Sequence, residues 1–172
     1  DPLNPNDVTV INDDNDAATV AIASVTQVEL DSGTSPYNFA VTHSGAPVIG
    51  GYSVVWFTQS GIAPAATQPS DFTGAGGTLN FTGTAGETKT ITITVNGDTR
   101  VEPNETFKVV LSTVTNATGK NVTIPTIGKT AIGTITNNDG ATFAINDATI
   151  VEGNTGTSTL SFTVTLSEAN HG

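Results

Sequence analysis

The 172-residue sequence contains no cysteine and no methionine. Disulfide bonds, thiolate metal sites and thiol nucleophiles are therefore excluded. Basic residues are also scarce, because five Lys and Arg stand against 16 Asp and Glu, which gives a formal net charge of -11. Such a chain repels polyanions, which argues against nucleic-acid binding. No apolar run approaches the roughly 20 residues that cross a bilayer, so we expect no membrane span in a mature or excised chain.

Threonine and glycine are abundant, and Gly alone accounts for 18 residues. This composition is typical of secreted bacterial surface repeats, so we expect an extracellular or cell-surface location. The pattern of apolar residues is that of strands. In TKTITITV, Ile91, Ile93 and Val95 alternate with threonine, which is the period of a half-buried strand. The same alternation predicts further strands at residues 18–23, 37–43, 52–59, 77–82, 106–112 and 129–136. We therefore expect an all-β, immunoglobulin-like antiparallel sandwich of about seven strands.

An internal repeat divides the chain into three parts. Residues 18–22 (ATVAI) recur as residues 141–145 (ATFAI), and residues 9–14 (TVINDD) resemble residues 134–139 (TITNND). The sequence thus predicts the last strand of one unit and a linker at 1–16, a complete domain at 17–139, and the first two strands of another unit at 140–172. The incomplete units cannot bury their apolar faces alone. Either tandem repetition or strand exchange between chains would complete them, so neighbouring copies of the domain are the expected partners.

Acidic residues concentrate in one set of loops. In an antiparallel sandwich the first, third and fifth connections lie at one end, together with the end of the last strand. These segments carry Glu29, Asp71, Asp98, Glu102, Glu105 and Asp139. The loops at the other end, residues 44–51 and 113–128, carry no acid. Converging carboxylates repel one another unless they are protonated or neutralised by a cation.

Oxygen is the ligand atom that these loops offer, which predicts a hard cation. Calcium accepts six to eight oxygens in a loose geometry that loops can supply, whereas magnesium requires a tighter octahedron. Zinc would prefer histidine or cysteine. The competing interpretation is local turn chemistry, since Asp and Asn are favoured in turns, but it does not explain why one set of loops holds the acids.

At these residues the sequence resembles the Calx-beta family of calcium-binding sandwich repeats. The resemblance covers the whole central unit and rests on VELDSG, FTQSGIA, PSDF, GGTLNFTGTAGETKTITI, VEPNETFKVVLS and GTITNND. It implies calcium ligation by Glu29, Asp71, Asp98, Glu102 and Asp139, with Glu105, Asn137 and Asn138 in support. By the repeat, Asp14 and Glu152 would belong to equivalent sites of the adjoining units.

The sequence departs from the family pattern at several positions. Asn96 and Gly97 stand where the family often has aspartates, Asn137 and Asn138 replace acids, and Ile62 replaces a threonine. Fewer carboxylates predict fewer or weaker sites, with dissociation constants of roughly 10⁻⁴–10⁻³ M. Calcium bound beside the boundary between units would stiffen the junction of a stalk or filament.

An enzyme is not expected. His43 and His171 have no Ser or Asp partner at motif spacing, and although Asp98 and Glu102 resemble a glycosidase pair, nothing marks a substrate cleft. A carbohydrate-binding surface module with structural calcium, and surface glycans as partner, is the alternative function. It would need exposed aromatic rings, whereas aromatic residues make up 6% of the chain and Trp56 alternates with core positions.

Overall fold

The computed structural model describes residues 15–117 and 119–167. Along the chain lie β1 (Ala18–Ile22), β2 (Val25–Val28), β3 (Thr34–Gly45), β4 (Tyr52–Ser60), β5 (Gly76–Phe81), β6 (Thr88–Asn96), β7 (Glu105–Thr115), β8 (Val122–Thr123), β9 (Thr130–Thr136), β10 (Phe143–Ile145) and β11 (Val164–Leu166). In the described ranges there is no helix that could cross a membrane.

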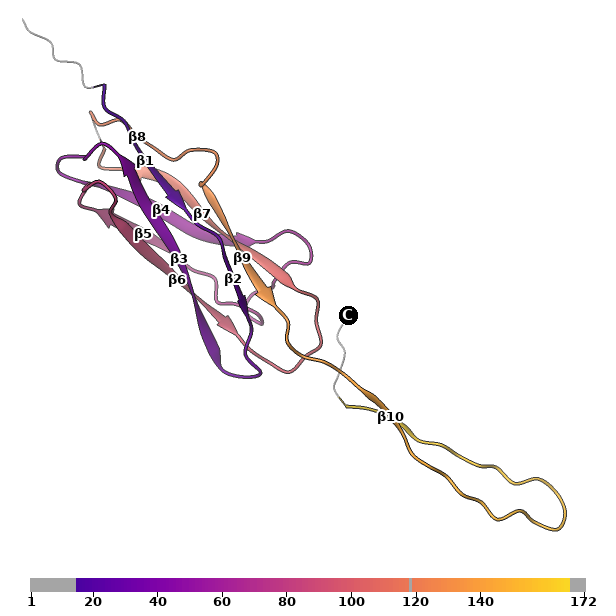
Figure 1. The fold of residues 1–172 in the computed structure, drawn as a ribbon. Helices are drawn as coiled ribbons and strands as arrows, with labels where there is room; N and C mark the ends of the chain where they lie inside the picture. Colours follow the sequence, from indigo (N-terminus) through magenta and orange to yellow (C-terminus); the bar gives the residue numbers. More distant parts are fainter. Residues whose placement is uncertain (1–14, 118, 168–172) are drawn as a thin grey trace, which may run out of the picture.

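Strands β1 to β9 form a two-layered sandwich (Figure 1). One sheet has the order β6-β3-β1-β8 and the other the order β2-β9-β7-β4-β5. The core between them is apolar, and the ring of Phe107 from the second sheet lies 5.8 Å from that of Phe39 in the first. Phe72, from the loop between β4 and β5, stacks on Phe107 at 4.5 Å. The predicted sandwich is thus confirmed.

Each of the seven predicted strands is present, because alternation dictates which side chains face the core. In β6, Ile91, Ile93 and Val95 are buried while Thr92 and Thr94 are exposed. Burial of each such side chain contributes about 1.5–3 kcal/mol.

The first predicted strand corresponds to β1, and a further short strand, β2, follows it in the other sheet. β1 pairs antiparallel with β3, whereas β2 crosses to the other sheet and pairs parallel with β9. At the crossing, the hydroxyl of Ser24 accepts a hydrogen bond of 2.9 Å from the backbone amide of Ile132. β2 was missed from the sequence because its four residues hold too little alternation. β2 matters for the position of Glu29, because it brings this residue to the end of β9, where the Glu29 amide donates to the carbonyl of Thr136 at 3.1 Å.

Trp56 packs against the core, as its alternation predicted. Its ring lies over Gly77 of β5, where a Cβ atom would come within 3.4 Å of the indole nitrogen. A bulge between Val55 and Trp56 shifts the register of β4 against β7, and Val55 and Phe57 are half-buried. In the described part of the sandwich, residues 15–139, the large apolar side chains that are well exposed are aliphatic, which disfavours a sugar-stacking surface.

β10 and β11 form a separate two-stranded hairpin. The chain enters it four residues after Asp139, and the long loop between the two strands projects away from the sandwich (Figure 1). Its apolar side chains are exposed.

Candidate metal centre

One end of the sandwich is built from four segments: residues 29–33, 61–75, 97–104 and 137–139. We call this end the acidic pole. Four hydrogen bonds join the segments: Gly97 N to Gly33 O at 3.0 Å, Asn96 N to Asp71 O at 2.8 Å, Asn137 N to Asn104 Oδ1 at 3.1 Å, and Asn138 Nδ2 to Asp31 Oδ1 at 2.8 Å. The antiparallel order of the strands therefore brings together the loops that the sequence predicted to meet.

Three carboxylates lie close together at this pole. Asp71 comes from the loop between β4 and β5, Glu102 from the loop between β6 and β7, and Glu105 is the first residue of β7. One oxygen from each lies within 4.8 Å of the others, and all three side chains are half-buried. Ligand atoms at such separations can share a single cation.

Glu29 lies beside this group and is only 8% exposed. Burial, followed in order by the charges of Asp98, Asp139, Glu102 and Asp71, raises the pKa of Glu29 to about 7. These four acids therefore lie within electrostatic range of Glu29. The structure therefore gathers six of the predicted ligands in one place.

Glu105 and Asp71 are coupled by a side-chain hydrogen bond that shifts their pKa values in opposite directions. Burial, a hydrogen bond to Asp71 and the charges of Asp71, Glu102 and Glu29 raise the pKa of Glu105 to about 7. Burial alone would raise the pKa of Asp71, but hydrogen bonds from Thr67, Ser70 and Glu105 lower it overall. The site thus relieves its repulsion by protonation, which is one of the two outcomes expected for crowded acids.

Two polar residues that the sequence did not reveal hold Asp71 in place. The amide and hydroxyl of Thr67 donate to Asp71 Oδ2 at 2.6 and 3.0 Å. The side-chain amide of Asn96 donates to the carbonyls of Pro69 and Ser70 at 2.7 and 2.8 Å. Asn96 is one of the departures from the family pattern, and the structure shows that it fixes the loop that carries Asp71. No periodicity or spacing in the sequence signals such a contact, because it joins residues far apart in the chain.

Local turn chemistry explains part of the placement of Asp98. Its Oδ1 accepts a hydrogen bond of 2.8 Å from the backbone amide of Arg100, which is the interaction that favours Asp in turns. The same carboxylate is nevertheless the largest charge contribution to the raised pKa of Glu29. Asp98 can therefore stabilise its own turn and also belong to the acidic group.

Of the two remaining predicted ligands, one is not described and the other lies away from this pole. Asp14 falls outside the described residues. Glu152 is exposed in the loop between β10 and β11, which projects away from the acidic pole (Figure 1). Asn137 and Asn138 lie at the pole, and the Asn137 side chain donates to the carbonyl of Asp139 at 3.0 Å. Glu152 stays a prediction for a completed second unit.

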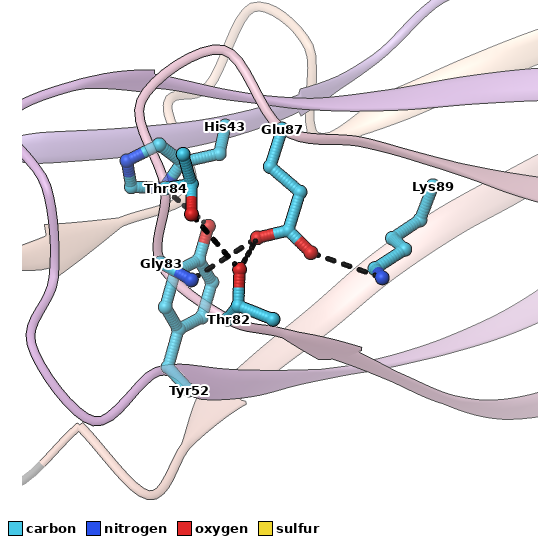
Figure 2. A network of polar contacts seen from close by, with 7 residues as sticks. All are labelled: His43, Tyr52, Thr82, Gly83, Thr84, Glu87 and Lys89. Atoms are coloured by element: carbon cyan, nitrogen blue, oxygen red, sulfur yellow. Dashed lines mark hydrogen bonds and ion pairs between the residues drawn. The ribbon is translucent and has the colours of Figure 1, made fainter.

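Glu87 at the opposite end shows how this protein neutralises an acid with its own groups (Figure 2). Its carboxylate accepts hydrogen bonds from the Thr82 hydroxyl at 2.8 Å and the Gly83 amide at 3.0 Å, and pairs with Lys89 at 2.9 Å. Although burial opposes the shift, these partners lower the pKa of Glu87 to about 2. At the acidic pole the corresponding pKa shifts of Glu29 and Glu105 are upward, because burial and neighbouring carboxylates disfavour the charged form there.

The donor set at the acidic pole suits a hard cation. Its side chains offer oxygen atoms from carboxylates, with Asn amide oxygens and loop carbonyls nearby. Calcium takes such ligands at about 2.3–2.6 Å and tolerates the irregular geometry that four separate loops provide. The residues present therefore fit calcium.

Comparison with known proteins agrees with this geometry. The family model described as the Calx-beta domain matches residues 13–148. The chain belongs to the Calx-beta family. No curated protein matched the sequence.

Solved structures show the same Calx-beta fold. The apo-form Calx CBD1 domain is 21% identical with a TM-score of 0.58, over 72% of this chain and 99% of that one. CBD12 from CALX1.2 is 22% identical with a TM-score of 0.57, over 75% of this chain and 49% of that one. The calcium binding domain CBD12 of CALX1.1 is 21% identical with a TM-score of 0.55, over 71% and 44%. This chain thus spans about half the length of the CBD12 chains.

Proposed function

We propose that this Calx-beta domain binds calcium at its acidic pole, and that the bound ion stiffens the junction with the unit that follows. The observation that carries the proposal is the meeting of Asp71, Glu102 and Glu105 oxygens within 4.8 Å in a chain of this family. The raised pKa values of Glu29 and Glu105 support it, because burial and then the charges of neighbouring carboxylates both contribute to each rise. The role is structural rather than enzymatic.

The place of Asp139 links binding to the junction. Asp139 follows β9, and its charge raises the pKa of Glu29, so the two carboxyls lie near each other. An ion held by both would tie the segment leaving β9 to the loop after β2. The next strand, β10, begins at Phe143, only four residues later. A short segment anchored at its origin has less freedom to swing. In a stalk or filament outside the cell, the location that the composition favours, such an ion would set the stiffness of each joint.

The test is calcium binding to the double variant Asp98→Asn, Glu102→Gln. For the unaltered protein we expect a calcium-dependent rise in melting temperature, since a ligand at a hundredfold excess over Kd adds about 2.7 kcal/mol of stability. We also expect a narrower range of shapes in small-angle X-ray scattering. The double variant should lose both effects while keeping its fold.

Glu87→Gln is the matched control, because it removes an acid at the opposite end that already has protein partners. It should retain the full calcium response. If calcium changes neither the melting temperature nor the scattering of the unaltered protein, the turn-chemistry interpretation is sufficient and the proposal is wrong. If the double variant still responds fully, the ion lies elsewhere.

A further inference from the structure

The sequence contains four copies of the pattern Asn-x-Thr, which begin at Asn80, Asn104, Asn116 and Asn121. This pattern is an acceptor for N-glycosylation, in which a sugar is linked to the side-chain amide of the Asn and the Thr hydroxyl two residues later is required. A chain rich in Asn and Thr acquires such patterns readily, so the sequence does not distinguish among the four. The contacts of their side chains in the fold do distinguish them.

The Asn80 pattern is held by contacts within the sandwich. The Ser53 hydroxyl donates to Asn80 Oδ1 at 2.8 Å, and the Thr82 hydroxyl donates to the carboxylate of Glu87 at 2.8 Å (Figure 2). The same Ser53 hydroxyl accepts a hydrogen bond of 3.4 Å from the side-chain amide of Asn116. A glycosyltransferase would have to break these contacts to reach either asparagine.

The Asn104 pattern is held at the acidic pole. Asn104 Oδ1 accepts a hydrogen bond of 3.1 Å from the backbone amide of Asn137. The Thr106 hydroxyl donates to the carbonyl of Ile62 at 2.7 Å and accepts from the amide of the same residue at 2.8 Å. Both polar side chains of this pattern are therefore engaged in joining loops.

Asn121 and Thr123, in contrast, are presented to solvent together. β8 pairs with β1, and residues two apart on a strand lie on the same face. Asn121 and Thr123 are accordingly exposed, while Val122 between them packs against the core. Among the described residues, neither the side-chain amide of Asn121 nor the hydroxyl of Thr123 has a hydrogen-bond partner. The Asn121 carbonyl accepts a hydrogen bond of 2.9 Å from the amide of Ala18, so the fold fixes the backbone and leaves the acceptor side chain available.

The surface beside Asn121 suits a sugar ring. Asn121 borders a hollow of about 150 Å³ that Ile49 and Lys120 also line, and Ile49 is 89% exposed. The C–H face of a hexose can cover the Ile49 side chain. Lys120 Nζ donates to the carbonyls of Gly51 and Asn116 at 2.6 and 3.4 Å and keeps a third proton for a sugar hydroxyl.

We propose that Asn121 is an N-glycosylation acceptor that takes one hexose from a sugar nucleotide. In the transfer, Nδ2 of Asn121 forms a bond to C1 of the hexose while the bond from C1 to the phosphate oxygen breaks. The nucleoside diphosphate leaves with that electron pair, and one proton of Nδ2 passes to solvent. The linked hexose lies over Ile49, at the end of the sandwich opposite the acidic pole. The inference does not depend on calcium binding.

The experiment uses the folded full chain. It is incubated with a soluble N-glycosyltransferase that recognises Asn-x-Thr and with UDP-glucose, and the modified residues are located by peptide mass spectrometry. Rates on short peptides that each carry one pattern correct for the preference of the enzyme itself. We expect one hexose at Asn121, added at least about tenfold faster than at Asn80 or Asn104 after this correction, because those two patterns become accessible only through local opening of the fold.

Variants at one pair of facing residues test the pattern. Thr123→Val removes the required hydroxyl and should abolish the modification of Asn121, whereas Thr123→Ser should retain it. Thr19→Val is the matched control, because Thr19 lies opposite Thr123 in the register of β1 and β8 but outside the pattern, and it should leave the modification unchanged. The proposal is overturned if the folded chain is not modified at Asn121 or if the Thr123→Val chain still is. Equal corrected rates at Asn80 or Asn104 would also overturn it, since the contacts of the fold would then not select the site.

Discussion

Without calcium, we predict that the stability of this domain falls as the pH rises from about 5 to 7. Glu29 and Glu105 have an ordinary pKa of 4.5 and a folded-state pKa of about 7. Because both values are raised, the folded protein binds more protons than the unfolded chain in this range. The stabilising contribution is fully present below 4.5 and is lost as the pH rises through 7.

The size of the effect follows from the shifts. A pKa raised from 4.5 to about 7 corresponds to about 3 kcal/mol for one carboxyl. The two groups share neighbours and are partly open to solvent, so we expect about 2 kcal/mol for the pair rather than twice the single value. For a sandwich of this size, that change lowers the melting temperature by about 6–10 °C.

The assay is thermal unfolding at several pH values between 5 and 7.5, after calcium has been removed and again with calcium in excess. With calcium the fall should disappear, because the ion neutralises the carboxylates that otherwise take up protons. Glu105→Gln should remove about half of the pH dependence, whereas Glu87→Gln, at the far end with a pKa near 2, should leave it unchanged in this range. A calcium-free protein whose melting temperature is constant or rises between pH 5 and 7 would refute the reasoning.

Three further substitutions test particular contacts. Asn96→Ala should weaken calcium binding by about tenfold, which corresponds to a loss of about 1.4 kcal/mol in binding free energy, because the loop that carries Asp71 loosens. The melting temperature without calcium should stay nearly unchanged. Titration calorimetry measures the calcium affinity, and an unchanged affinity would show that Asn96 does not position Asp71. His43→Leu introduces the residue that the repeat has at this position and should lower the free energy of unfolding by about 1–3 kcal/mol, because it leaves the buried Tyr52 hydroxyl without its 2.7 Å partner. Adding Tyr52→Phe should restore part of this loss, as measured by denaturant unfolding. Fully additive effects of the two substitutions would contradict the contact. Gly133→Ala should cost about 1–3 kcal/mol in the same assay, since its Cβ would lie 2.4 Å from the Phe107 ring, with calcium affinity unaffected; a neutral result would mean that the ring moves freely.

The fold was readable from the sequence because its information is local. Alternation in β6 and β9 fixes which side chains face the core, and turn residues mark the ends of the strands. Strand β2, which follows β1 in the other sheet, was not predicted. The contact of Ser24 with Ile132 at the crossing joins residues far apart in the chain and leaves no periodic signal.

The candidate site was predictable to a similar degree. Strand parity alone placed the acidic loops at one end, and the structure brings Asp71, Glu102 and Glu105 together there. Strand parity does not predict which carboxylate oxygens lie close enough together to bind one ion. It also does not predict that Asn96, at a position where the family often has an aspartate, donates hydrogen bonds to the neighbouring loop. Those features depend on the conformation of the loops, which composition and spacing do not determine.

The two ends of the sandwich solve the same electrostatic problem differently. Glu87 is neutralised by Lys89 and by donors on its own loop, so that end needs nothing from solution (Figure 2). At the acidic pole, burial and neighbouring carboxylates raise the pKa of Glu29 and Glu105 instead, and this pole lies where the chain leaves β9 for the hairpin. If calcium binds at this end as proposed, it would confer calcium sensitivity on the joint and leave the rest of the sandwich insensitive. If the hairpin completes a second sandwich, Glu152 takes the place of Glu29 there, and each successive joint carries its own site. The stiffness of each junction in an array would then depend on the calcium bound at that junction.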